Sequence, residues 1–203
     1  IFVNGREGVK RSPKDAFDLK ICMIHQHFKL VDVFDAVQNI VLGVNDGEKY
    51  NLKKAEERVK AITDKYGFVI DLNKKVYEMS VSEKQTVEII KVLYRGADIL
   101  ILDEPTAVLT PQETEKLFDV LRKMREDNKS IIIITHKLHE VLENSDRVTI
   151  LRKGEYVDTV ETKDATEQSL PEMMMGEKVS LIITRTAPKT PAPRIVVDKL
   201  SVK

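Results

Sequence analysis

The sequence has no excess of charge of either sign, little cysteine and no long apolar run. Lys and Arg together number 33, as do Asp and Glu, so the basic surplus typical of nucleic-acid-binding proteins is absent. The single cysteine, Cys22, excludes an internal disulfide and favours a reducing compartment. No apolar run approaches the ~20 residues that a membrane-spanning helix needs. The function must therefore be sought in local motifs rather than in bulk composition.

A regular alternation of strands and helices occupies the second half of the sequence. Strands are predicted at 98–105, at 129–136 and at 146–154, the last turning into 155–162, and the helices between them at 111–127 and 137–145. The first two strands, with the cores ILIL and IIIIT, are apolar throughout. This pattern is typical of parallel strands that are covered by helices on both faces. The sequence therefore predicts an α/β fold, with a mostly parallel sheet sandwiched by helices.

Three further helices are predicted before residue 96, at 33–43, 52–67 and 80–96. Gly67 and Gly96 are suited to end two of them, and Ser80 with Glu83 has the spacing of a capping box. Nearer the N-terminus, a short strand and an Asn-Gly turn precede a helix that Ser12 can cap. We expect the helices before residue 96 to form an α-helical subdomain beside the sheet.

Polar side chains follow three of the apolar strands. Asp103 and Glu104 end the strand ILIL, His136 follows IIIIT, and Gln26 follows ICMIH. Ligands bind at the carboxyl edge of open α/β sheets, where these residues would meet. Asp103 can hold Mg²⁺ and Glu104 can polarise a water for attack on a phosphate, while His136 can contact a terminal phosphate. Individually, each residue has a plainer interpretation. Asp103 and Glu104 could cap the next helix, His136 could be an ordinary loop histidine, and the Gln26 amide could satisfy backbone groups.

A strand of this kind usually works with a glycine-rich phosphate loop, and none is present. No G-x-x-x-x-G-K-[ST] occurs in the sequence. The segment GREGVKRS at residues 5–12 has glycines and a lysine, but at the wrong spacing.

The order of motifs resembles that of ATP-binding cassette (ABC) ATPases, in particular the tandem-cassette importers of simple sugars and nucleosides. The resemblance lies in VYEMSVSEKQTVEIIKVLYRGADILILDEPTAVLTPQE, in IIIITHKLHEV, in SDRVTILRKGE and in MIHQHFKLVDVFDAVQNIVLG. It covers nearly all of residues 1–186. In the family the phosphate loop lies just before the first strand of this chain, so the resemblance implies that this loop and the first strands are missing. We expect apolar surface to be exposed as a result.

The resemblance also implies roles for individual residues, with ATP and Mg²⁺ as cofactors. Asp103 and Gln26 would hold Mg²⁺, Glu104 would be the catalytic base, and His136 and Gln26 would complete the catalytic set. Two segments would meet the opposing cassette: the signature segment, which contacts its ATP, and the D-loop at the interface. The first consists of Ser80, Val81, Ser82 and Glu83, and the second of Ala107, Val108, Leu109 and Thr110.

The implied organisation has five parts. These are a partial ATPase core at 1–26, an α-helical and signature subdomain at 27–95, the rest of the core at 96–186, a Pro-rich linker at 187–194, and the start of a second cassette at 195–203. The implied partners are that second cassette, transmembrane permease subunits and, indirectly, a solute-binding lipoprotein or protein, with no nucleic acid. The implied location is the cytoplasmic face of the cell membrane, peripherally bound.

The signature segment departs from the family pattern. Ser82 stands where the family has glycine, and Thr86 where an arginine or lysine is frequent. A degenerate cassette that acts as a structural or regulatory partner is therefore the alternative to an active ATPase. Cassettes of chromosome maintenance or DNA repair are a weaker alternative, because no long coiled coil fits between Gln26 and Ser80.

Overall fold

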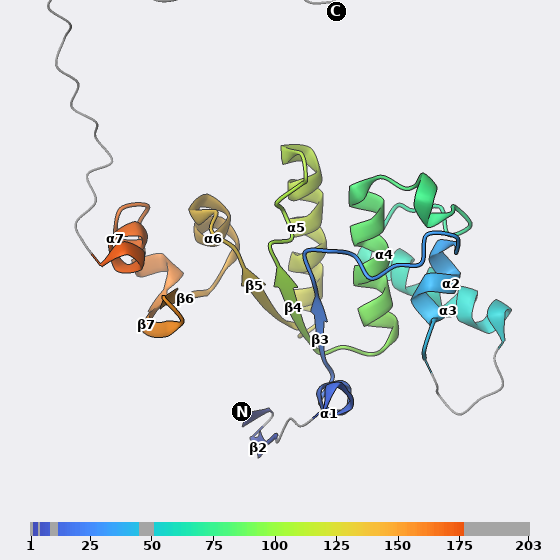
Figure 1. Ribbon diagram of the computed structural model, residues 1–203, viewed down its shortest axis with the longest axis horizontal. Coiled ribbons are helices and arrows are strands. Elements are labelled where there is room, and N and C mark those ends of the chain that lie inside the picture. The colour runs from blue at the N-terminus through green and yellow to red at the C-terminus, as the bar shows by residue number, and fades with distance from the viewer. Residues whose placement is uncertain (1, 4, 9–11, 45–50, 177–203) are drawn as a thin grey trace, which may run out of the picture. The chain divides into compact units, whose positions relative to one another are not determined.

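The computed structural model describes residues 2–3, 5–8, 12–44 and 51–176 (Figure 1). The chain divides after Leu138 into two compact units. The predicted linker at 187–194 and second-cassette start at 195–203 lie outside the described residues, as does part of GREGVKRS. Within the described residues, every helix is too short or too polar to cross a membrane.

The first unit opens with a short hairpin and a capped helix. Strands β1 (Phe2–Val3) and β2 (Arg6–Glu7) pair antiparallel across the predicted turn, where Gly5 has a φ of 74°. Helix α1 (Pro13–Asp18) follows, and the Ser12 hydroxyl accepts the backbone N–H of Asp15. The predicted cap is thus confirmed.

The centre of this unit is a parallel three-stranded sheet in the order β3-β4-β5. Its strands are β3 (Ile21–Ile24), β4 (Ile99–Asp103) and β5 (Ser130–Ile134). The register pairs Ile24 with Leu102 and Asp103 with Ile134, so the carboxyl ends of all three strands lie at one edge (Figure 1). The predicted α/β class and parallel sheet are confirmed.

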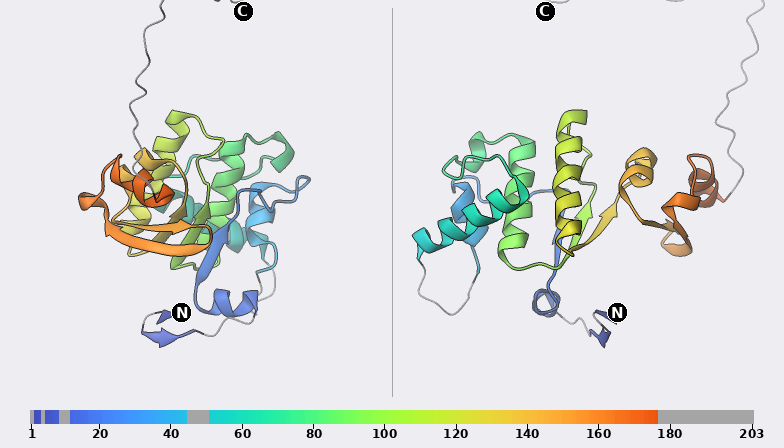
Figure 2. Two further views of the ribbon diagram at one scale, coloured as in Figure 1. Left: turned by 60° about the vertical axis from the view of Figure 1, so that its left-hand side comes forward. Right: turned by 180° about the vertical axis from the view of Figure 1, so that it is seen from behind.

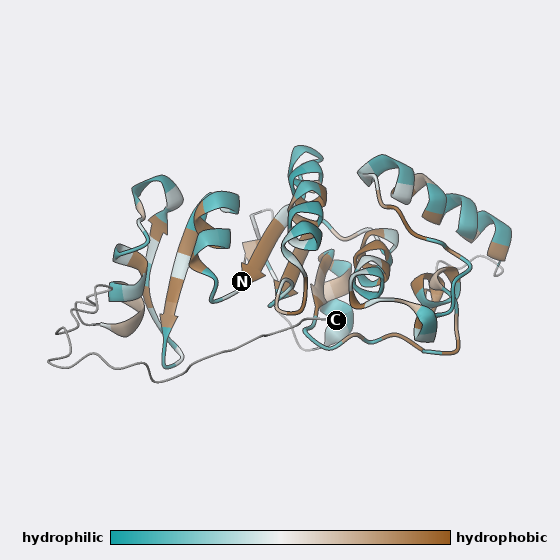
Figure 3. Ribbon diagram, turned by 90° about the horizontal axis from the view of Figure 1, so that it is seen from above, coloured by the Kyte–Doolittle hydropathy of each residue, from teal (hydrophilic) through white to brown (hydrophobic). Residues whose placement is uncertain are grey.

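Two helices, α4 (Val81–Tyr94) and α5 (Pro111–Glu126), cover one face of this sheet (Figures 1 and 2). Leu100 and Leu102 on β4 pack there against Ile89 of α4 and Phe118 of α5. This packing explains why the strands are apolar, as their brown colour in Figure 3 shows.

The opposite face of the sheet is partly open. Met23, Ile132 and Ile134 are 40%, 50% and 48% exposed on it. Side chains of strand neighbours point to opposite faces, so these residues cannot join the core under α4 and α5. Helices were predicted on both faces of the sheet, and among the described residues they form a complete layer on one face. The exposed side chains on the other face agree with the expected exposure of apolar surface.

A second core joins α4 to a helical layer beside the sheet. Helices α2 (Ala36–Val41) and α3 (Leu52–Tyr66) and the short 3-10 helix η1 (Val76–Glu78) pack against the far side of α4. Gly67, at a φ of 76°, ends α3 as predicted. Because its buried residues line both cores, α4 links the helical layer to the sheet.

The second unit holds a hairpin and two short helices. Helix α6 (Leu138–Asn144) leads into β6 (Arg147–Arg152) and β7 (Glu155–Glu161), which form a separate antiparallel pair with an irregularity after Ile150. The 3-10 helix η2 (Thr162–Asp164) and helix α7 (Ser169–Met175) follow. Leu170 of α7 is fully buried, and α7 packs against β6.

Candidate functional site

The site begins at the carboxyl edge of the parallel sheet. Asp103 is the last residue of β4, Gln26 lies two residues beyond the end of β3, and His136 lies two beyond the end of β5. The strand order places β4 between the other two. All three predicted residues therefore leave neighbouring strands at the same edge, and Gln26 and His136 are exposed there.

Glu104 and His136 are in direct contact. Nδ1 of His136 lies 2.8 Å from Oε1 of Glu104, and the backbone N–H of Glu104 donates to the carbonyl of Ile134 at 2.9 Å. The Glu104 side chain is 21% exposed and that of His136 is 73% exposed. The other carboxylate oxygen of Glu104, Oε2, is buried and has no hydrogen-bond partner among the described residues. A buried acceptor without a donor costs about 1–3 kcal/mol, and such groups occur at catalytic sites as well as where water or an ion binds.

The backbone at Glu104 is in the left-handed region, with a φ of 47°. Non-glycine residues adopt this conformation at a cost of about 1–3 kcal/mol, and such residues cluster at functional sites. Two side chains hold the segment that follows. Gln85 of α4 donates to the Pro105 carbonyl at 2.7 Å, and Nζ of Lys137 donates to the Thr106 carbonyl at 2.8 Å.

The segment predicted as a D-loop runs from this point to α5. Ala107, Val108 and Thr110 are exposed, while Leu109 is half-buried against the core of the sheet. Thr110 begins α5 through a capping box with Glu113, whose carboxylate accepts the Thr110 N–H at 2.9 Å. An exposed segment between two anchored ends is suited to contact another molecule.

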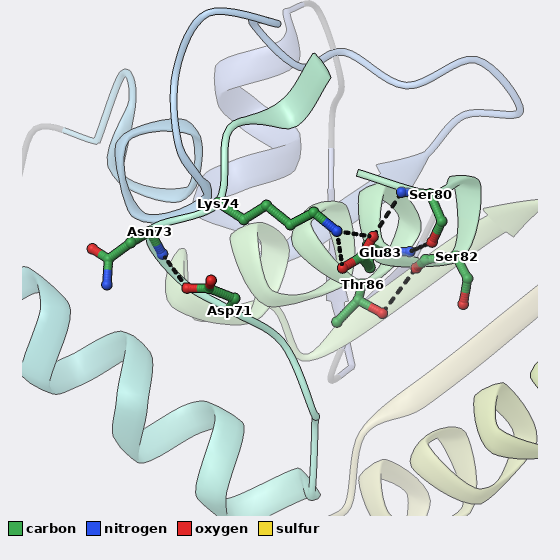
Figure 4. Close-up of polar contacts among 7 residues, drawn as sticks. All are labelled: Asp71, Asn73, Lys74, Ser80, Ser82, Glu83 and Thr86. Carbon is green, nitrogen blue, oxygen red and sulfur yellow. Dashed lines mark hydrogen bonds and ion pairs between the residues drawn. The ribbon is translucent and has the colours of Figure 1, made fainter. Parts of the chain in front are cut away.

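The predicted signature segment forms the start of α4 (Figure 4). The Ser80 hydroxyl accepts the Glu83 N–H at 3.2 Å, and the Glu83 carboxylate accepts the Ser80 N–H at 2.7 Å, so the predicted capping box is confirmed. Nζ of Lys74 lies 2.8 and 2.9 Å from the two Glu83 oxygens. The Lys74 ammonium, and next the Ser80 N–H, hold the pKa of Glu83 below its ordinary range.

The two residues that depart from the family pattern contact each other. The Thr86 hydroxyl donates to the Ser82 carbonyl at 3.0 Å, one turn back along α4 (Figure 4). Hydrogen bonds from Thr110, first from its backbone and then from its side chain, lower the pKa of Glu113, and the Ser82 hydroxyl adds to this effect.

We expect replacement of Lys74 with methionine to raise the pKa of Glu83, because it removes the largest cause of the depression. A depressed carboxyl pKa stabilises the fold above the unfolded-state value of about 4.3, and this stabilisation is lost as the pH falls through the folded value. The variant should therefore be less stable than the parent at pH 7, by about 0.5–1 kcal/mol, with a smaller difference below pH ~4.

NMR titration of the Glu83 carboxyl and urea unfolding at the two pH values measure these effects. Lys84→Met is the matched control, because Lys84 lies next to Glu83 in sequence and is not among the causes of its shift. An equal change of the Glu83 pKa in both variants would contradict the assignment.

The oxygen ligands at the sheet edge fit a hard cation. Asp103 supplies a carboxylate and Gln26 an amide oxygen, and Mg²⁺ is commonly held by one or two protein oxygens together with substrate phosphates and water. Throughout the described ranges, no three His, Cys, Asp or Glu side chains gather as a metal site. A carboxylate and an amide oxygen are ligand types that suit Mg²⁺ arriving with a phosphate ligand.

Three residues that hold the site carry no signal in the sequence. Lys74, Gln85 and Lys137 each bind a site segment, at separations of 9, 20 and 31 residues. A lysine or glutamine without a motif around it is typical of solvated surface. These contacts depend on the tertiary fold and could not be predicted from the residues alone.

A protein-family model described as ABC transporter matches residues 1–107 of the chain. The nucleoside import ATP-binding protein NupA of Lactococcus lactis subsp. cremoris is 42% identical over the whole chain, which spans 40% of its length. The glucose import ATP-binding protein TsgD13 of Haloferax volcanii is 42% identical over 90% of the chain and is matched over 39% of its own length.

The fold also matches solved structures. The structure of cbiO1 from Clostridium perfringens, described as part of an ABC transporter complex, aligns with 79% of this chain and 65% of its own, with a TM-score of 0.67 at 24% identity. At this identity the likeness concerns the fold alone.

Proposed function

Because the chain belongs to the ABC transporter family, we propose that it is part of an ATP-hydrolysing subunit that energises import of a nucleoside or a simple sugar. The observation that carries the proposal is the paired Glu104 and His136 beside Asp103 at the sheet edge. The names of the relatives, which are nucleoside and glucose import proteins, support the solute class. The chain spans about 40% of the length of those relatives, so the activity of a whole import subunit is itself part of the proposal.

In this proposal Asp103 and Gln26 would hold Mg²⁺, which would neutralise charge on the transferred phosphoryl group. Glu104 accepts a proton from the attacking water. Within the described residues its Oε2 makes no hydrogen bond, so protonation of this oxygen would break none. His136 binds Oε1 and thereby fixes the orientation of the carboxylate.

Two partly exposed segments serve partner molecules. Residues 80–83 contact the ATP of an opposing cassette, and residues 107–110 lie at the interface with it. The other partners are permease subunits at the cytoplasmic face of the membrane and, through them, a solute-binding lipoprotein or protein. The chain alone hydrolyses almost no ATP, because it has no phosphate-loop motif.

Uptake into sealed vesicles tests the proposal. The assembly contains the polypeptide that carries this chain, its permease and its binding protein, with ATP enclosed on the cytoplasmic side. We expect uptake of a radiolabelled nucleoside or simple sugar, together with release of inorganic phosphate. Amino acids and divalent cations are the control solutes, and uptake of these without a nucleoside or sugar would contradict the solute class.

A degenerate cassette is the second candidate, because Ser82 and Thr86 replace the residues that the family has in the signature segment. Restoring glycine and arginine at these positions in the same assembly separates the two candidates. An active cassette should show phosphate release before and after the change. Release only after the change would favour the degenerate cassette.

A further inference from the structure

The segment that leaves β3 after Gln26 has no regular secondary structure, yet its backbone is bound at alternate residues. The N–H of Lys29 donates to Oε1 of Glu88 at 2.7 Å, and Nζ of Lys91 donates to the Lys29 carbonyl at 3.0 Å. Both side chains come from α4. Both polar groups of one residue's backbone are therefore held by one helix, 59 and 62 residues away in sequence.

The same arrangement recurs two residues further on. The N–H of Val31 donates to Oδ1 of Asn39 at 2.7 Å, and Nδ2 of the same amide donates to the Val31 carbonyl at 3.1 Å. Asn39 lies on α2 and is 0% exposed. We call residues 27–31 the strap. Its backbone is paired as it would be beside a strand, but by buried side chains of two helices.

The use of Glu88 and Lys91 to bind one backbone unit requires the burial of two charged side chains. Their side chains are 10% and 11% exposed, and Nζ of Lys91 lies 3.7 Å from Oε2 of Glu88. Burial lowers the pKa of Lys91, and the charge of Glu88 opposes this shift. Removing two charges from water often costs more than their attraction returns, so a buried pair is weak evidence for stability and better evidence for fixed geometry.

Helix α4 also reaches the other parts of the site. Its first turn is the signature segment at residues 80–83, and Gln85 in its second turn binds the carbonyl of Pro105, next to Glu104. Helix α4 therefore contacts the strap beyond Gln26 and the segment beyond Glu104. Its own first turn is the surface that would meet the opposing cassette.

We propose that Glu88 and Lys91 are positioning residues for Gln26: they clamp the strap to α4, so that Gln26 and the signature segment keep a fixed spacing and move together. The proposal rests on the proposed ATPase function. The proposal explains why Glu88 and Lys91 are buried as a charged pair, although such a pair is weak evidence for stability. The effect of the clamp on turnover must then pass through Gln26.

The test measures phosphate release by the transport assembly that carries Glu88→Ala, Glu88→Gln or Lys91→Met. We expect Glu88→Ala to lower kcat about 10-fold and to change KM for ATP less than about twofold, because misplacement of a reacting group affects the chemical step. Glu88→Gln keeps the acceptor for the Lys29 N–H and should retain most of the activity. Hydrogen exchange of the Lys29 amide should become faster in Glu88→Ala and stay slow in Glu88→Gln.

A double-mutant cycle with Gln26→Ala separates positioning from general damage. If the clamp acts through Gln26, Glu88→Ala should lower kcat less than about twofold further in the Gln26→Ala background. An undiminished loss of about 10-fold there, or an unchanged exchange rate of the Lys29 amide, would overturn the proposal. Asp119→Ala is the matched control, because Asp119 and Arg122 form an ion pair of the same i,i+3 spacing on the exposed face of α5.

Two further variants cover the case in which Glu88→Ala does not fold and the case in which the ATPase function itself fails. If Glu88→Ala does not fold, the Glu88→Gln and Lys91→Met double variant removes both charges, keeps the acceptor for the Lys29 N–H and loses only the donor to its carbonyl. It should lower kcat, again less so without Gln26, and full activity would overturn the proposal. Glu104→Gln reports on the ATPase function itself, so a failure of the clamp with a normal loss in Glu104→Gln leaves that function standing.

Discussion

Replacing Glu104 with glutamine is expected to lower kcat for ATP hydrolysis by the transport assembly about 10²- to 10⁴-fold. Glutamine keeps the size of the side chain and can still bind His136, but it cannot accept a proton from water. The affinity for Mg-ATP should change little, because Glu104 acts on the attacking water rather than on the ground-state nucleotide. Phosphate release at saturating ATP and equilibrium nucleotide binding measure the two effects separately.

Glu115→Gln is the matched control for this prediction. Glu115 lies on α5 with its side chain 77% exposed, and the same change there should leave kcat unaltered. If the Glu104→Gln variant keeps its turnover, Glu104 is not the base. If it loses nucleotide binding together with turnover, the carboxylate holds the nucleotide instead.

Local signals in the sequence predicted many of the helix ends that the structure shows. Ser12 caps α1, Ser80 and Glu83 form the box that starts α4, and Gly67 ends α3. Each of these depends on residues within about four positions of one another, where the chemistry of capping leaves little choice. The apolar strands were equally plain, because a run such as IIIIT has few other uses in a folded chain.

The conformation and partners of the site residues were beyond the reach of local patterns. Nothing in the sequence marks Glu104 for a positive φ, since the surrounding fold rather than its own preference holds it there. Glu88 and Lys91 have the spacing of a helical ion pair, and their task at Lys29 depends on a contact 59 to 62 residues away. The positions of Asp103, Gln26 and His136 at one edge were predictable, whereas the contacts that hold them were not.

The open face of the sheet shows how the site is limited. Its exposed members, Met23, Ile132 and Ile134, lie on strands whose ends lead to candidate catalytic residues. Among the described residues, a face of this kind leaves the edge of the sheet without a second layer to enclose a phosphate. Mg-ATP would then be held from one side only, with Mg²⁺ between its phosphates and the Asp103 carboxylate.

The 203-residue chain by itself is therefore expected to bind Mg-ATP weakly and to hydrolyse almost none. A Kd of about 1 μM requires about −8.2 kcal/mol, and hydrogen bonds to charged groups contribute about 1.5–3 kcal/mol each. A phosphate loop would supply several such bonds from backbone N–H groups and a lysine, whereas the sequence offers Asp103, Glu104 and Gln26 at this edge. Both acids repel the phosphates unless Mg²⁺ lies between them.

Titration calorimetry with Mg-ATP measures the affinity of the isolated chain, and a phosphate-release assay measures its turnover. The transport assembly is the positive control, and circular dichroism verifies that the chain is folded. Binding weaker than micromolar, with no release above background, is the expected result. Micromolar affinity with steady turnover that Glu104→Gln abolishes would mean that the chain holds the triphosphate without the motif. The inference from the missing phosphate loop would then be wrong, because binding groups outside the sheet edge would have to supply the remaining free energy.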